Sequence, residues 1–457
     1  MTVPVPVPES ASTAAPAERG PKLQRVLGIP SLLFFGLAYM VPMTVFSTYG
    51  IVTNVTEGHL AGAYVITTVA MLFTALSYAS IVRSVPTAGS AYGYARTAFG
   101  PGIGFVTGWA LMIDYLLLPM VNYMLLGLYI NAQFPQIPAW SVIVVAIAVV
   151  TTLNLLGISV VKNANAFLVL FQIAFIVVFV VLALGRLDGS APATSPFWSE
   201  HAHLAALAAG ASILALSFLG FDAVSAMAEE AKEPRRTVPV AVILTVVVGG
   251  LLFVLITWLG QRVWPDYASF TDFDTASLEL ISHVGGAFLE AFFLAAYLVG
   301  ASASALTSQA STARVLYSMG RDGVLPRSFF GRLGERFRTP RNAILLIAAV
   351  ALLALVLDLE IVISVISFGA LAAFSMVNLT VIKHFIIDER RRGMRAMLQY
   401  LVLPLIGFGL TIWLWLSLSG QALIIGAIWV AVGVVYLAVL TRGFRTMPKA
   451  IEVDLDA

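Results

Sequence analysis

The sequence contains no cysteine, which excludes disulfides, thiolate metal sites and cysteine nucleophiles. Charged residues are scarce: they make up 11% of the 457 residues, whereas a soluble domain carries about a quarter. Hydrophobic residues make up 60%. Polar surface is too limited to cover a soluble protein of this size, so the composition predicts an integral membrane protein.

The two ends of the chain also lack the pattern of a signal peptide. Residues 1–27 are rich in Pro, Ala and Ser and have no basic stretch followed by an apolar core. Such a composition predicts a disordered tail. Residues 442–457 are interpreted in the same way, which leaves residues 28–441 as one membrane domain.

Long apolar runs fill that domain. A spanning helix needs about 20 apolar residues, and twelve stretches come near this length. The expected spans are 30–56, 60–82, 102–132, 139–157, 164–185, 203–228, 238–261, 278–312, 342–357, 361–384, 400–418 and 421–440. The sequence therefore predicts an all-α membrane protein with twelve transmembrane helices.

The basic residues test this count. With a cytoplasmic N-terminus, all of the 26 Lys and Arg residues except Arg186 and Arg262 fall on the cytoplasmic side of the spans. The expected external loops carry acids instead, such as Asp266 and Glu360. This bias follows the positive-inside rule. We therefore expect a multi-pass protein of the cytoplasmic (inner) membrane with both termini inside.

Two of the expected spans contain residues that interrupt helices. The first span has Gly36 and Pro42 on either side of "LAYMV", and the sixth has Gly220 and Asp222 within "LSFLGFDAVS". A broken helix survives in hydrocarbon only where it is buried in protein or lines an aqueous cavity. The alternative is that a Gly/Pro pair merely kinks its helix.

The position of the two interruptions favours a binding site. They fall in spans one and six, so each opens one half of a five-plus-five arrangement. Paired interruptions in corresponding positions point to an inverted-repeat transporter and to its binding site. We therefore expect a LeuT-type inverted repeat whose broken helices offer backbone groups and partial charges.

Two carboxylates lie well inside expected spans. Acids in the membrane are costly and face the bundle interior or a watery path, so each indicates a function. Asp114 is interpreted as a cation-binding or proton-carrying group, the alternative being a structural hydrogen bond to a broken helix. For Asp222 the same role and the capping of freed amides both stay open. The aromatic rings of Tyr39, Tyr115 and Phe218 lie beside these groups and can face a cation.

Three segments carry a family resemblance. Residues 85–109 ("VPTAGSAYGYARTAFGPGIGFVTGW"), 217–242 ("SFLGFDAVSAMAEEAKEPRRTVPVAV") and 310–326 ("ASTARVLYSMGRDGVLP") resemble the amino acid–polyamine–organocation (APC) superfamily. The first of them resembles the loop and third-helix start of that superfamily. The likeness covers residues 25–440, and it implies the fold above and secondary active transport.

A closer likeness is to bacterial putrescine importers, through residues 36–64, 112–125 and 217–224. It implies uptake of a small diamine driven by the proton gradient, with Tyr115 in contact with the substrate. The expected substrate-binding residues are Tyr39, Met40, Asp114, Tyr115, Phe218, Gly220 and Asp222.

The first break itself favours a cationic substrate. Amino acid members usually have a small, Gly-rich break whose bare amides hold the substrate carboxylate. Here residues 38–42 are bulky, and Pro42 lacks a donor. A diamine can place one ammonium at Asp114 and the other at Asp222 or at backbone carbonyls. An amino acid permease of the same superfamily, for cationic or neutral amino acids, is the alternative.

One position departs from the resemblance. Several proton-coupled relatives place a lysine in the fifth helix, where this chain has Gln172. An amide cannot carry that proton, so coupling would fall to Asp114 or Asp222, and uniport or exchange stay open. Ser302 and Ser304 in the eighth span fit either a sodium-like site or helix packing.

A cytoplasmic gate is a further hypothesis. Glu229 and Glu230 end the sixth span and can pair with Arg83 when the site is closed to the inside. The alternative is a solvated helix end with local ion pairs.

Other classes of protein are disfavoured. The five His residues are scattered and no Ser/His/Asp arrangement appears, so we expect no enzyme, no metal and no cofactor. A channel would need a repeated pore element, and the tails are too short to signal as a sensor. Basic loops on anionic lipid explain the positive charge without nucleic acid or an obligate protein partner.

Overall fold

The structure is a computed structural model. It describes residues 27–84, 91–156, 164–187, 192–228, 231–321, 324–334 and 339–443. The α-helices are α1 (Ile29–Met40), α2 (Thr44–Ser47), α3 (Tyr49–Val55), α4 (Leu60–Ser84), α5 (Ala91–Phe99), α6 (Pro101–Gln133), α7 (Ala139–Leu156), α8 (Ala164–Leu184), α9 (Leu204–Ile213), α10 (Ala223–Ala226), α11 (Pro234–Val263), α12 (Ala276–Arg321), α13 (Arg327–Phe330), α14 (Arg341–Ala351), α15 (Leu359–Val381), α16 (Met394–Met397), α17 (Leu403–Leu416) and α18 (Gly420–Leu440). Short 3₁₀ segments are η1 (Leu214–Phe218), η3 (Tyr267–Ser269) and η4 (Leu352–Leu355), and π-helical segments are η5 (Ile382–Asp388) and η6 (Leu398–Val402).

Among the described residues, ten helical segments are long and apolar enough to cross a membrane. Two shorter apolar segments, Leu170–Leu184 and Arg341–Leu355, lie where the fifth and ninth spans are expected. The prediction of an all-helical membrane protein is confirmed. Most of the two predicted tails, residues 1–26 and 444–457, lies outside the described ranges.

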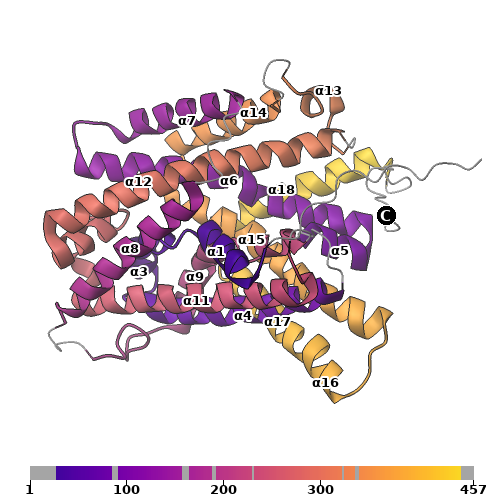
Figure 1. The fold of residues 1–457 in the computed structure, drawn as a ribbon, viewed down its shortest axis with the longest axis horizontal. Helices are drawn as coiled ribbons and strands as arrows, with labels where there is room; N and C mark the ends of the chain where they lie inside the picture. Colours follow the sequence, from indigo (N-terminus) through magenta and orange to yellow (C-terminus); the bar gives the residue numbers. More distant parts are fainter. Residues whose placement is uncertain are drawn as a thin grey trace, which may run out of the picture.

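The long helices run side by side along one direction. In Figure 1, α1 lies in the middle of the bundle, with α6 and α12 above it and α4 and α11 below it. α5, α13 and the C-terminal end of α18 lie toward the right-hand end. Basic residues there include Arg96, Arg327 and Arg442. These basic segments therefore gather at one end of the bundle.

The first interruption is shorter than predicted. α1 continues to Met40, so the expected role of Gly36 as one edge of the break is wrong. Pro42 accounts for the end of the helix, because proline disfavours the α conformation in the residue before it. Val41, the residue before Pro42, leaves the α region with a φ of 48° and a ψ of 90°, and β-branched residues rarely adopt such a positive φ. The chain resumes as α2 at Thr44.

Gly36 instead allows close helix packing. A Cβ at this position would lie 2.6 Å from Thr245 Oγ1 on α11 and 2.8 Å from Val224 Cγ2 on α10. The residue is buried within a regular helix. Its glycine therefore serves the approach of α1 to its neighbours and does not interrupt α1.

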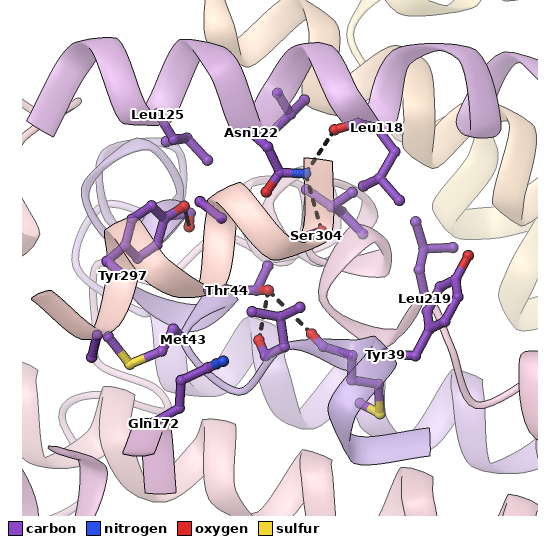
Figure 2. A pocket seen from close by; sticks show the side chains of 18 residues that line it. Tyr39, Met43, Thr44, Leu118, Asn122, Leu125, Gln172, Leu219, Tyr297 and Ser304 are labelled. Atoms are coloured by element: carbon purple, nitrogen blue, oxygen red, sulfur yellow. Dashed lines mark hydrogen bonds between the residues drawn. The ribbon is translucent and has the colours of Figure 1, made fainter. Parts of the chain in front are cut away.

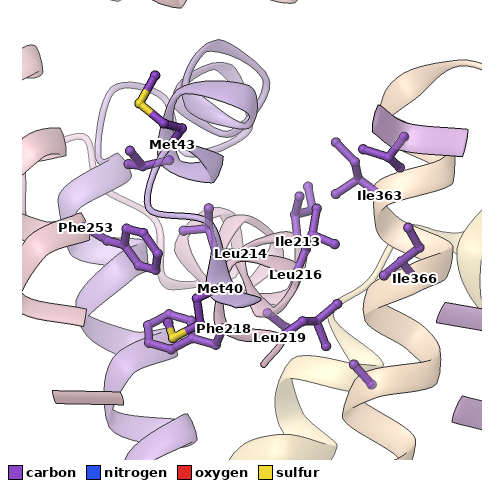
Figure 3. Packing of buried hydrophobic residues seen from close by; sticks show 14 of the residues in the cluster. Met40, Met43, Ile213, Leu214, Leu216, Phe218, Leu219, Phe253, Ile363 and Ile366 are labelled. Carbon is purple, nitrogen blue, oxygen red and sulfur yellow. The ribbon is translucent and has the colours of Figure 1, made fainter. Parts of the chain in front are cut away.

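The second interruption follows α9. The chain tightens into η1, turns through Gly220 with a φ of 117°, and resumes as α10 at Ala223. A Cβ on Gly220 would lie 2.6 Å from Tyr39 Cδ1 and 3.0 Å from Met40 N. The two interruptions therefore meet at this glycine, and Figure 3 shows Met40 beside Phe218 and Leu219 there.

Two further elements differ from the expectation. α12 covers the predicted eighth span but is divided at Gly286, where φ is 62° and ψ is −162°. α5 lies in the segment for which the resemblance implies a loop; it buries Ala91, Tyr94 and Ala95 on one face. A helix of nine residues is too short to give a span-length apolar run.

Two tryptophans tie α18 to α6. Trp109 Nε1 donates to the carbonyl oxygen of Trp429 at 2.9 Å, and Trp429 Nε1 donates to that of Trp109 at 2.7 Å. Their rings stack with centroids 5.0 Å apart. Tyr436 stacks on Trp109 and donates its hydroxyl to the carbonyl of Val324. These contacts hold the two helices as one unit.

We predict that Gly36→Ala lowers the stability of the protein by about 1–3 kcal/mol, because the added methyl overpacks the contact with α11. Thermal unfolding of the purified protein in detergent measures the change. The matched control is Gly409→Ala in α17, where a Cβ meets no atom within 4 Å. An equal melting temperature for both variants would contradict the assigned packing role.

Candidate functional site

A cavity of about 50 Å³ lies beside the first interruption. Its lining comes from residues 39–47, η1 and the turn after it, and α6, α8 and α12. Figure 2 shows Asn122, Gln172 and Tyr297 around it, with Tyr39 and Leu219 at one side. A space of this size has room for a few water molecules. The cavity is therefore small and closely lined.

Hydrogen bonds from Thr44 satisfy backbone carbonyls at the first break. The Thr44 hydroxyl donates to the carbonyl oxygens of Met40, at 3.1 Å, and Val41, at 2.7 Å. The Thr44 amide also donates to Val41 O at 2.8 Å. The carbonyls freed at the end of α1 are thus satisfied by the first residue of α2, as a break in hydrocarbon requires.

A stripe of α6 faces this break. Asp114, Leu118 and Asn122 are spaced by four residues, so they lie on one face of the helix. Asp114 is 4% exposed, and its Oδ1 has no hydrogen-bond partner among the described residues. Asn122 donates both amide hydrogens, to Leu118 O at 2.9 Å and to Ser304 Oγ at 3.1 Å. The buried carboxylate therefore keeps an acceptor free.

Asp222 takes part in the second break. Its Oδ1 accepts a hydrogen bond of 3.1 Å from the amide of Gly220, and its side chain is half-buried. This bond is to an amide of the turn before α10, and the Asp222 side chain makes no capping hydrogen bond to α10 itself. Asp222 is also near enough to Asp114 for the two carboxylates to interact electrostatically.

Tyr39 stands between the acids and the cavity. It lines the cavity, and it interacts electrostatically with both Asp114 and Asp222. Tyr115 interacts electrostatically with Tyr39, Asp114 and Asp222. The structure thus brings Tyr39, Tyr115 and the two acids into one cluster. Because Tyr39 also packs on Gly220, one ring links the two interruptions.

An aromatic seal closes the cavity on the α3 side. We use this name for Phe46, Tyr129, Phe175, Phe179, Phe293 and Tyr297, each at most 5% exposed. Phe46 packs edge-on against Phe175, Phe179 and Phe293, with centroids 5.3–5.6 Å apart. Tyr297 shares a 2.7 Å hydrogen bond with Ser47 at the cavity wall. The side of the site toward α3 is therefore packed shut.

Comparison with known proteins gives the family. The amino acid permease family matches residues 32–450. The chain belongs to this family.

Several characterised permeases are similar along nearly their whole length. The chain is 41% identical over 431 residues to the low-affinity putrescine importer PlaP of Escherichia coli (strain K12), covering 93% of this chain and 95% of that protein. It is 26% identical to the methylthioribose transporter of Bacillus subtilis (strain 168), covering 96% and 98%. It is 25% identical to the branched-chain amino acid permease BcaP of Lactococcus lactis, covering 91% and 94%.

Within this permease, the predicted substrate residues divide into three groups. Tyr39 and Met40 line the cavity. Asp114, Tyr115 and Asp222 form the adjoining charged cluster. Phe218 and Gly220 do not line the cavity. Phe218 is fully buried and packs edge-on against Phe253 of α11, 5.5 Å between centroids, and Gly220 lies in the turn against Tyr39.

The residues predicted to couple or gate transport lie in different places. Gln172 lines the cavity from α8, and its Oε1 has no hydrogen-bond partner among the described residues. Ser304 lines the cavity, whereas Ser302 is exposed on the outside of α12. Arg83 is exposed at the end of α4, and its predicted partners Glu229 and Glu230 lie outside the described residues.

Among the cavity residues that sequence reasoning missed are Ser47, Leu118, Asn122 and Tyr297. The four-residue spacing from Asp114 is a signal that points to Leu118 and Asn122. Ser47 and Tyr297 are 250 positions apart, so their contact has no local signal.

We predict that Asp222→Ala destabilises the permease by about 1–2 kcal/mol, because the Gly220 amide loses its acceptor. Asp222→Asn keeps an acceptor oxygen at the same place and is expected to cost less. Thermal unfolding of the two variants gives the comparison. Equal losses for Ala and Asn would exclude the assigned hydrogen bond as the reason.

Proposed function

We propose that this permease is a secondary active transporter that imports a small amine such as putrescine across the cytoplasmic membrane by alternating access, coupled to protons. The observation that carries the proposal is the buried Asp114 carboxylate, which lies near Tyr39 of the first break and has an acceptor oxygen without a partner among the described residues. A charge in such a place is costly unless a cation meets it. The similarity to a putrescine importer over 93% of the chain supports the choice of substrate.

The proposed architecture has twelve spans in a LeuT-type five-plus-five inverted repeat with both termini in the cytoplasm. Ten long and two shorter apolar segments support the count. The two interruptions, which follow α1 and α9, support the repeat. The gathering of basic residues around α5 and α13 at one end supports the orientation.

The first break favours an amine over a carboxylate. Pro42 has no amide hydrogen, and the Thr44 amide is already bonded to Val41 O. The break therefore has few amides for a carboxylate, while its neighbours on α6 supply a negative charge. In the proposed mechanism Asp114 binds an ammonium, and Asp114 or Asp222 carries the coupling proton.

A second candidate is an amino acid permease of the same family. The relative named as a branched-chain amino acid permease favours it, with 25% identity over 91% of the chain. Uptake by the purified protein in liposomes separates the candidates when putrescine, lysine and leucine are compared with and without an imposed pH gradient. Leucine uptake in the absence of putrescine uptake would favour this second candidate.

We predict that Asp114→Asn abolishes putrescine uptake while the protein still reaches the membrane in normal amount, because the neutral amide no longer attracts the ammonium. The assay is labelled putrescine uptake by proteoliposomes. Asp266→Asn, at an exposed loop position, is the matched control and is expected to transport normally. Unchanged uptake by Asp114→Asn would reject the assignment.

The aromatic seal provides a test of alternating access. We predict that Tyr297→Phe opens the seal more often, because it removes the hydrogen bond to Ser47. Since the chain has no cysteine, a single cysteine introduced at Thr44 reports access to the cavity. Labelling of Thr44→Cys by an impermeant maleimide added outside intact cells is expected to be several-fold faster in the Tyr297→Phe background. The same labelling rate in both backgrounds would contradict the role of this bond.

A further inference from the structure

The cavity, which Asp114 does not line, contains polar groups whose hydrogen atoms are mostly committed. Asn122 uses both of its amide hydrogens, on Leu118 O and Ser304 Oγ. The Thr44 hydroxyl hydrogen is shared between Met40 O and Val41 O. What these two residues still offer to the cavity is therefore oxygen lone pairs, which are the groups that an ammonium seeks.

Gln172 completes this set from α8. It is 4% exposed, lines the cavity, and its Oε1 has no hydrogen-bond partner among the described residues. Figure 2 shows the amide nitrogen of Gln172 directed into the cavity toward Thr44. A Cβ on Gly300 would lie 3.1 Å from the Gln172 amide nitrogen, so a glycine leaves room for the amide there. A buried acceptor without a partner is costly and indicates a missing donor.

The spacing along α6 sets the length of the ligand. Asp114 and Asn122 are eight residues apart, which corresponds to about 12 Å of helix at 1.5 Å per residue. The five bonds between the nitrogens of a four-carbon diamine, each about 1.5 Å long, extend to roughly 6 Å. One charge-assisted hydrogen bond of about 2.8 Å at each end brings the total near 12 Å. Leu118 lies midway and offers an apolar surface to the methylene groups.

We propose that Asn122 and Gln172 form a second ammonium subsite, which together with Asp114 selects diamines by length. This inference rests on the proposed function, because it assumes that Asp114 binds the first ammonium. Asp222 does not line the cavity, and its Oδ1 accepts a hydrogen bond from the Gly220 amide, so it is not assigned to the far end. The far ammonium binds the neutral amide oxygens of Asn122 and Gln172, and the near ammonium binds the carboxylate of Asp114.

The test uses the full-length protein in liposomes and measures inhibition of labelled putrescine uptake by putrescine and by n-butylamine, which has no second ammonium. Gln172→Met keeps the length of the side chain and breaks no hydrogen bond seen in the structure, so it is expected to fold normally. We expect Gln172→Met to weaken inhibition by putrescine roughly tenfold, because one hydrogen bond to a charged group is lost. Inhibition by butylamine is expected to stay unchanged. The control Gln133→Met, at an exposed position of α6, is expected to leave both unchanged.

The same assay tests the length rule on the wild type, for which three-carbon and five-carbon diamines are expected to inhibit less than the four-carbon diamine. If Gln172→Met leaves both amines unchanged, or weakens both equally as loss of a bound sodium ion or water would, the subsite is rejected while the proposed function stands. Equal inhibition by the three diamines would reject the length rule. If the wild type takes up no amine, the proposed function itself fails, and the subsite with it.

Discussion

The need to satisfy an interrupted backbone inside hydrocarbon governs this molecule. Each break frees carbonyl and amide groups that lipid cannot bond. At the first break the Thr44 hydroxyl donates hydrogen bonds to the carbonyls of Met40 and Val41. At the second, Asp222 accepts a hydrogen bond from the amide of Gly220. Because the breaks touch at Gly220, the groups that repair them converge on one place. The binding region is built from these repairs together with one face of α6.

The position of the first break could be predicted because its cause is local. Proline acts on its own residue and on the one before it, so Pro42 ends α1 wherever the helix packs. Gly36 was a poorer guide, because one glycine is tolerated in a helix and its reason here is the surface of α11. That surface is set by a helix about two hundred residues further along the chain. Gly220, in contrast, was a good guide to the second break. The turn there needs a positive φ, which glycine adopts readily.

The candidate site shows the same division. Asp114 could be found from sequence because an acid within an apolar run is rare. Phe218 is an aromatic residue beside the second break, as expected of a site residue. Its ring nevertheless packs against Phe253, and this contact is decided by tertiary packing. Ser47 and Tyr297 each look like ordinary polar positions in long helices, and only their contact gives them a role. Which polar groups share a cavity depends on how helices cross, and a single sequence does not record this.

The Trp109–Trp429 pair has a mechanical consequence. Each indole is anchored on the backbone of the other helix, so α18 and α6 resist sliding along each other. Trp109 precedes Asp114 on α6 by little more than one turn, while the other face of α18 carries exposed residues such as Ile428 and Val435. The helix that bears the buried acid Asp114 is therefore fastened to a helix whose opposite face is apolar and exposed, so a displacement of α18 would be transmitted to the segment of α6 that holds this acid.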